Sequence, residues 1–128
     1  MKCVKIYLRS VRLEVKGIAE NHLAMFDSNH MGAIDNLITD VQAGGTVIWA
    51  LDRCSGIKSI NAVYTKNGKR NVFRSDPRKR FLCKGFKLPI SEEANGEEEY
   101  CIKYTICDGR EITIDPVIRI PPPPTGIK

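Results

Sequence analysis

The metal-capable residues that lie closest together in the sequence are His22, Asp27, His30 and Asp35. Imidazole nitrogens and carboxylate oxygens are zinc ligands, so a loop that folded back on itself could use them to hold the ion. Their spacing matches no known zinc site, and turn residues such as those at 27–30 are also typical of a solvated loop. We therefore expect no metal and no other cofactor.

Nucleophilic catalysis requires a nucleophile beside a general base that a third group orients. Neither histidine lies near a cysteine in the sequence, and no G-x-S-x-G elbow is present. The pair Gly44-Gly45 leads into a predicted strand and lacks the lysine of a phosphate-binding loop. The sequence therefore favours a protein that is not an enzyme.

The five cysteines are odd in number and include no CxxC pair, which favours reduced thiols: Cys3, Cys54, Cys83, Cys101 and Cys107. Met1 and Lys2 are followed by alternating residues rather than by the unbroken apolar run of a signal peptide. We expect a cytoplasmic protein, although a chain whose signal peptide had been removed would begin in the same way. No apolar run approaches the roughly 20 residues of a membrane span, so we expect none.

The most uneven charge in the sequence is basic and is interleaved with Phe73, Phe81 and Phe86. Exposed rings beside cations would suit single-stranded nucleic acid, with bases stacked on the rings and phosphates held by the cations. If the rings are buried, the cations form a solvated rim, and the sequence leaves both readings open. The nine basic residues are Lys66, Lys69, Arg70, Arg74, Arg78, Lys79, Arg80, Lys84 and Lys87, and the single acid among them is Asp76.

An acidic stretch without a basic residue follows, formed by Glu92, Glu93, Glu97, Glu98 and Glu99. Opposite patches on one small domain neutralise each other, pair head to tail between copies, or form solvated loops. Because the 128 residues carry 20 basic and 15 acidic side chains, the net charge of +5 permits an anionic partner without requiring one. We expect an interaction surface formed by Lys66, Lys69, Arg70, Arg74, Arg78, Lys79, Arg80, Glu97, Glu98 and Glu99.

The elements that position these residues are strands. Apolar residues occupy even positions from Val4 to Leu8 and odd positions from Val11 to Val15. This change of parity predicts one long strand with a bulge near Arg9 and Ser10. Its outward residues are mostly basic, which is typical of an edge strand.

The stretch from Gly17 to Gly45 is ambiguous. Residues 34–41 have apolar side chains at helical spacing, so a helix from about Asp35 could end at Gly44. A strand from Leu37 to Val41 that enters a turn explains the same residues. We favour the strand because everything downstream is predicted to be β.

Further along the chain the period-two pattern is clear. A central strand contains Trp49, which should anchor the core, and Asn67-Gly68 and Asp108-Gly109 predict two tight hairpin turns. The predicted strands are Thr46–Leu51, Ile57–Tyr64, Arg70–Phe73, Phe81–Ile90, Tyr100–Ile106 and Ile112–Ile120.

Seven to nine short strands in a chain of this length predict an all-β antiparallel β-sandwich. Such a sandwich could be of the Greek-key, immunoglobulin-like or cupredoxin-like type. We expect a single domain over residues 1–120 and a proline-rich tail over 121–128, where four consecutive prolines begin at Pro121.

Two segments resemble parts of a known family. VQAGGTVIWALD, at Val41–Asp52, is similar to the V-x-x-G-x-T-V-x-W segment of cupredoxin-like β-sandwiches, and EYCIKYTICDG, at Glu99–Gly109, resembles the aromatic hairpin near their C-terminus. Immunoglobulin-like sandwiches contain similar segments, so the resemblance implies architecture. Blue copper needs two His and a Cys, usually with a weak axial Met. Neither segment contains histidine, so the resemblance implies no copper.

These expectations combine into a non-catalytic interaction or assembly module. Its partner would be a protein or a second copy of the chain. The alternative is a nucleic-acid binder that uses the basic region 66–87.

Overall fold

Eleven strands and their connecting turns make up the described part of the chain, which comprises residues 3–66, 72–80 and 85–121 of this computed structural model and contains no helix. Seven to nine strands were expected, but β3 and β7 are only two or three residues long and were not predicted. The strands are β1 (Cys3–Val15), β2 (Ile18–Asp27), β3 (Gly32–Ile34), β4 (Ile38–Asp40), β5 (Thr46–Leu51), β6 (Ile57–Thr65), β7 (Arg78–Lys79), β8 (Phe86–Pro89), β9 (Gly96–Ile106), β10 (Glu111–Ile114) and β11 (Val117–Ile120).

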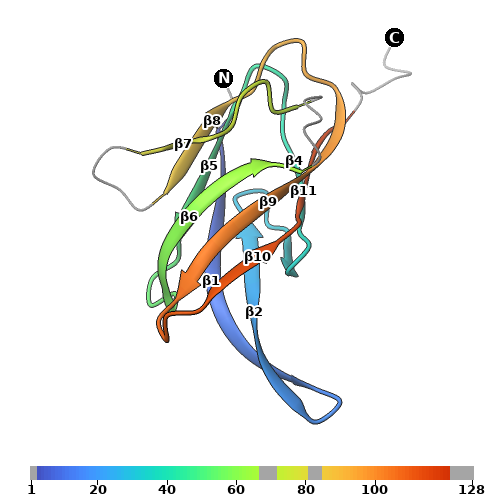
Figure 1. The fold of residues 1–128 in the computed structure, drawn as a ribbon. Helices are drawn as coiled ribbons and strands as arrows, with labels where there is room; N and C mark the ends of the chain where they lie inside the picture. Colours follow the sequence, from blue (N-terminus) through green and yellow to red (C-terminus); the bar gives the residue numbers. More distant parts are fainter. Residues whose placement is uncertain (1–2, 67–71, 81–84, 122–128) are drawn as a thin grey trace.

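The strands form two mixed sheets (Figure 1). One sheet has the order β3-β2-β1-β5-β8-β7, and the other has the order β10-β9-β11-β4 with β6 paired to β9. The all-β class is confirmed. Purely antiparallel pairing is wrong, because β1 pairs in parallel with β5 and β4 pairs in parallel with β11. Parallel partners are joined by long connections, so no short turn motif reveals them in the sequence.

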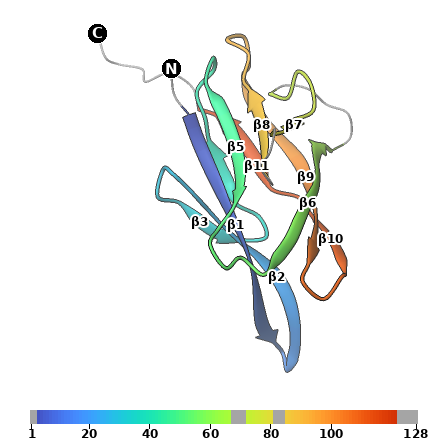
Figure 2. The ribbon, with the colours of Figure 1, turned by 90° about the vertical axis from the view of Figure 1, so that its left-hand side faces the viewer.

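The two sheets pack on one hydrophobic core, and Figure 2 shows β1, β3 and β5 in one layer and β6, β9 and β10 in the other. Trp49 in β5 is fully buried, and its Nε1 donates a hydrogen bond to Tyr100 Oη of the other sheet at 3.0 Å. The ring of Phe73 lies against both, with centroid distances of 6.0 Å to Trp49 and 5.2 Å to Tyr100. Trp49 therefore anchors the core, as expected.

The first hairpin has an unbroken antiparallel ladder between β1 and β2. It closes on Lys16 and Gly17, whose φ angles of 53° and 79° are the two positive values of a type I′ turn. The predicted bulge near Arg9 and Ser10 is wrong, because the ladder there has no register shift. The change of parity instead moves the apolar positions from the core face to the outer face of the sheet.

Residues 11–22 of this hairpin, which we call the arm, extend below both sheets in Figure 1 and Figure 2. β5 pairs with β1 only from Cys3 to Leu8, and the last backbone bond on that side joins Ser10 N to Ser55 O. β1 is therefore a central strand in its first half. It is an edge strand only in the arm, not along its whole length.

The ambiguous stretch is extended. β3 and β4 lie where a helix was the alternative, and Leu37, Thr39 and Val41 are buried. The strand prediction for this stretch is confirmed. β4 forms because β11 supplies its backbone partners from the far end of the sequence.

The two predicted hairpins differ in outcome. The hairpin around Asp108-Gly109 is confirmed, since β10 and β11 both return antiparallel to β9. The Asn67-Gly68 turn lies outside the described residues. The strand expected to follow it is not formed at Val72 and Phe73, whose N–H groups donate to Glu98 instead of to a neighbouring strand. Of the strand expected over 81–90, the described part contains only β8.

Candidate anion-binding groove

Six of the nine basic residues of the stretch lie in the described part of the chain, and Lys87 is one that was not expected to belong to the interaction surface. Lys66 Nζ lies 3.0 Å from Asp115 Oδ2, and the hydrogen bond to this carboxylate raises the pKa of Lys66. Arg74 lies 3.6 Å from Glu93. These two cations therefore have acidic partners within the molecule. Lys69, Arg70 and Lys84 lie outside the described residues.

The other four cations line one open groove of about 630 Å³ at the edge of the six-stranded sheet. Within residues 3–66, 72–80 and 85–121, no acidic side chain forms an ion pair with any of them. Asp76 is the one acid among the lining residues, and its Oδ1 accepts a bond from Thr65 N at 3.4 Å. The groove is thus electropositive. Its lining residues are Ser75, Asp76, Arg78, Lys79, Arg80, Lys87, Leu88 and Pro89.

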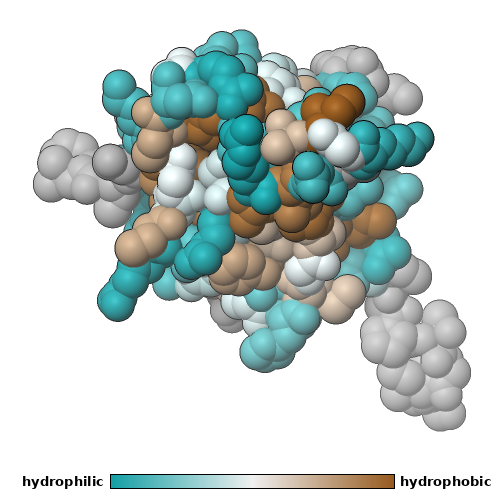
Figure 3. Space-filling model, turned by 90° about the horizontal axis from the view of Figure 1, so that it is seen from below, coloured by the Kyte–Doolittle hydropathy of each residue, from teal (hydrophilic) through white to brown (hydrophobic). Residues whose placement is uncertain are grey.

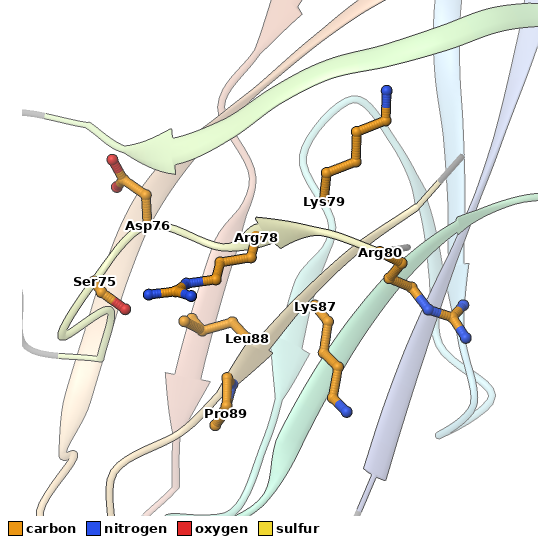
Figure 4. Close-up of a pocket in the computed structure, with 8 residues that line it drawn as sticks. All are labelled: Ser75, Asp76, Arg78, Lys79, Arg80, Lys87, Leu88 and Pro89. Atoms are coloured by element: carbon orange, nitrogen blue, oxygen red, sulfur yellow. The ribbon is translucent and has the colours of Figure 1, made fainter. Parts of the chain in front are cut away.

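The cationic side chains do not converge on a single point. Figure 4 shows Arg78 reaching along the groove towards Ser75, while Lys87 and Lys79 point to opposite sides of β7. Alternation along an extended segment explains the spread, because neighbouring side chains of a strand point to opposite faces. This arrangement suits an elongated anion with several charges better than one small ion.

Glu98 fixes the segment that leads into the groove. Its side chain is 4% exposed, and its Oε1 accepts hydrogen bonds from Val72 N at 2.8 Å and Phe73 N at 3.0 Å. These bonds hold the ring of Phe73 against Trp49. The acid that was expected to belong to a surface patch is therefore a buried structural residue.

Gly85 fixes the other side of the groove. Arg80 N donates to Gly85 O at 2.9 Å, which joins the end of β7 to the start of β8. A Cβ atom at Gly85 would collide with the backbone carbonyl of Trp49. Glycine therefore allows β8 to approach β5 here, beside the buried Trp49.

The aromatic residues do not form a stacking surface. Phe73 is fully buried and Phe86 is 7% exposed, while Phe81 lies outside the described residues. For the two described rings, the reading as core residues is therefore correct. The cations form a rim around them.

The acidic stretch is dispersed. Glu98 is buried, Glu93 pairs with Arg74, and Glu99 lies 3.7 Å from Lys66. The expected joint surface of residues 66–80 and 97–99 is therefore divided. Lys66 pairs with Glu99 and Asp115, and Arg74 pairs with Glu93. Arg78, Lys79, Arg80 and Lys87 have no ion-pair partner among the described residues. Sequence reasoning missed Ser75, Leu88 and Pro89, because only the pairing of β8 brings them to the groove.

The histidine and aspartate residues of the candidate zinc cluster are separated. His22 Nδ1 lies 2.7 Å from Asp35 Oδ2, whereas Asp27 Oδ1 accepts backbone bonds from Asn29 and Met31. His30 is exposed in the same turn with a positive φ of 68°. Among the described residues, no three His, Cys, Asp or Glu side chains gather closely enough to hold a metal ion.

Cys101 is the buried thiol of the described residues, and Cys3, Cys54 and Cys107 are exposed. Its Sγ donates to Asp115 Oδ1 at 3.5 Å, and burial followed by this carboxylate raises the pKa of Cys101. A nucleophilic cysteine needs the opposite shift, since the thiolate is the reactive form.

We expect iodoacetamide to alkylate Cys101 of the folded protein roughly tenfold more slowly than Cys54 or Cys107, because its thiol is buried and remains protonated. Mass spectrometry of digested samples taken over time measures each rate. Unfolding in urea is the control and should make the rates similar. Equal rates in the folded protein would contradict this assignment.

No family model matches the chain, and no curated protein matches it. Among the described residues there is no helix with the length and apolar character that crossing a membrane requires.

Proposed function

We propose that the protein is a non-catalytic interaction module that binds an acidic segment of a partner protein in the groove beside β7 and β8. The observation that carries this proposal is the set of four cations around the groove, none of which has an ion-pair partner among the described residues. Charged groups arranged in this way steer an oppositely charged partner and fix its register.

An extended segment fits the site for two reasons. The cations are spread along the groove (Figure 4), so they match charges that repeat along a chain. In addition, β7 is the last strand of its sheet, and one of its edges faces no other strand in the described structure. Peptides commonly add to such edges through backbone hydrogen bonds, while side-chain contacts give specificity.

The burial of the described phenylalanines favours a protein partner over nucleic acid. Sequence-tolerant binding of single strands relies on exposed aromatic rings, and both described rings, Phe73 and Phe86, are in the core. Nucleic-acid binding would then depend on phosphate contacts alone.

The proposed architecture is a β-sandwich of the Greek-key, immunoglobulin-like or cupredoxin-like type. Two sheets that share one core support it, as do the two sequence segments that resemble cupredoxin-like domains. Function in such folds depends on the individual site, which in this protein is the groove.

Fluorescence anisotropy with a labelled peptide of alternating Glu and Ser tests the function. We expect a Kd on the order of micromolar at low salt that weakens steeply as salt is added. Arg78→Glu or Lys87→Glu should weaken binding roughly tenfold, because each replaces an attractive charge with a repulsive one.

Lys58→Glu is the matched control, because Lys58 is exposed on β6 of the other sheet and the net charge changes equally. It should bind like the unchanged protein. A peptide with Gln in place of Glu should not bind. Tighter binding of single-stranded or duplex oligonucleotides in the same buffer would favour the nucleic-acid alternative, and equal losses in all three variants would rule out the groove.

A further inference from the structure

The arm has one apolar face. Leu13 is 38% exposed and Ile18 is 59% exposed, and both lie on the outer face of the sheet. Phe26 and Ile34 continue this face onto β2 and β3, since residues opposite each other in a ladder share a face. Seen from below, apolar side chains gather between polar ones (Figure 3). Glu20, opposite Leu13, and His22, opposite Val11, lie on the same face, so these apolar side chains form a mixed surface with polar neighbours. Exposed apolar side chains rimmed by polar ones are typical of an interaction surface.

The arm also has an open backbone edge. Ser10 N points to the side where β5 would lie, because it bonds Ser55 O there. Backbone groups alternate in direction along a strand, so the N–H and C=O groups of Arg12 and Glu14 point to the same side. No strand of the described structure pairs with β1 at these two residues on that side.

The residues along this edge are complementary to themselves. If a second β1 pairs antiparallel about Leu13, Arg12 lies opposite Glu14 of the other copy, and Leu13 lies opposite the other Leu13. The two-fold axis repeats the Arg12–Glu14 pair, so each dimer contains it twice. Neither side chain forms an ion pair in the described part of the chain. The charge of Arg12 lies near Asp108 and contributes, after the backbone hydrogen bond from Arg110, to lowering the pKa of that carboxyl.

We infer that this edge is a homodimer interface, in which the arms of two copies pair antiparallel about Leu13. The pairing makes one continuous sheet from two, and it joins the apolar faces of the two arms. A two-fold contact of this kind closes on itself, so association stops at the dimer.

Two other edges, the β2 side of the arm and β7, lack this complementarity. The same operation on β2 about Glu20 would place two glutamates opposite each other. β7 consists of Arg78 and Lys79, so two copies of it would repel. Like charges directly opposite each other destabilise a ladder, whereas opposite charges stabilise it. The β1 edge of the arm is therefore favoured over these two edges for pairing with a second copy.

Sedimentation equilibrium over a range of concentrations tests the dimer. We expect dissociation in the range of roughly 1–100 μM, since only a short edge is buried. Arg12→Glu alone and Glu14→Arg alone should each weaken the dimer about tenfold, because each places two pairs of like charges opposite each other. The double variant R12E/E14R should restore the affinity of the unchanged protein, since it exchanges the two charges.

Restoration by the double variant distinguishes this register from damage to the fold, which the second change would not repair. Leu13→Cys provides a second measurement, because cysteines at the axis lie within disulfide distance. It should form more covalent dimer under mild oxidation than Thr113→Cys, an exposed position on β10. A monomer at every concentration, or a dimer that the single variants leave unchanged, would overturn the inference.

Discussion

Trp49→Ala is expected to lower the free energy of unfolding by about 3–5 kcal/mol, the range for removing a fully buried tryptophan. The indole is 0% exposed, and it contacts Tyr100 from the opposite sheet and Phe73 from the segment between β6 and β7. Its loss opens a cavity where the two sheets meet. Urea denaturation followed by circular dichroism measures the change.

Trp49→Phe and Tyr100→Phe separate packing from the hydrogen bond. Burial raises the pKa of Tyr100, so its hydroxyl stays protonated at all ordinary pH values and accepts from Trp49 Nε1. Each single variant leaves one polar group without its partner, at about 1–3 kcal/mol. The double variant should therefore cost less than the sum of the two. Simple additivity would show that the hydrogen bond contributes nothing.

Glu98→Ala is expected to cost about 2–5 kcal/mol, because it leaves the N–H groups of Val72 and Phe73 buried without an acceptor. The loss also releases the segment that leads to the groove. We therefore expect weaker binding of the acidic peptide together with lower stability.

Glu98→Gln is the control for this variant, since it keeps an oxygen at the position that accepts both bonds. It should retain most of the stability that alanine loses. Thermal unfolding of the two variants side by side makes the comparison. If glutamine and alanine were equally destabilising, the two backbone bonds would not be the reason that Glu98 is buried.

Local patterns predicted much of the fold. The alternation from Tyr100 to Ile106 and the Asp108-Gly109 turn predicted the β9–β10 hairpin correctly, because a short turn and a period-two strand are encoded by adjacent residues. The position of Trp49 in the core was also predicted correctly, from the apolar alternation of its own strand. Each of these features depends on its own neighbourhood in the sequence.

The incorrect predictions of the fold concern strands and hydrogen bonds whose partners lie far apart in the sequence. The parity change in β1 was read as a bulge, because the sequence does not show that β5 stops pairing at Leu8 and leaves the arm alone. Val72 and Phe73 were read as a strand, although a buried carboxylate from β9 accepts their N–H groups. No local pattern records which distant residue supplies a hydrogen-bond partner.

The candidate site was predicted in part. The sequence identified a basic stretch but could not show which of its charges are already paired. The structure separates Lys66 and Arg74, which have acidic partners, from Arg78, Lys79 and Arg80 at the groove. A prediction from charge density alone therefore overstated the size of the surface. It also could not show that β7 pairs with β8 and so brings their cations to one groove.

The parallel pairing of β4 with β11 has a consequence for how the chain is made. Arg119, whose guanidinium bonds the carboxylate of Asp40 at 2.7 Å, lies 79 positions after it. A nascent polypeptide leaving the ribosome therefore exposes the hydrogen-bonding edge of β4 until Val117–Arg119 has been synthesised. Topologies dominated by such distant pairings fold slowly, on the order of milliseconds to seconds. Pairing of β4 is thus completed only after β11 has been translated.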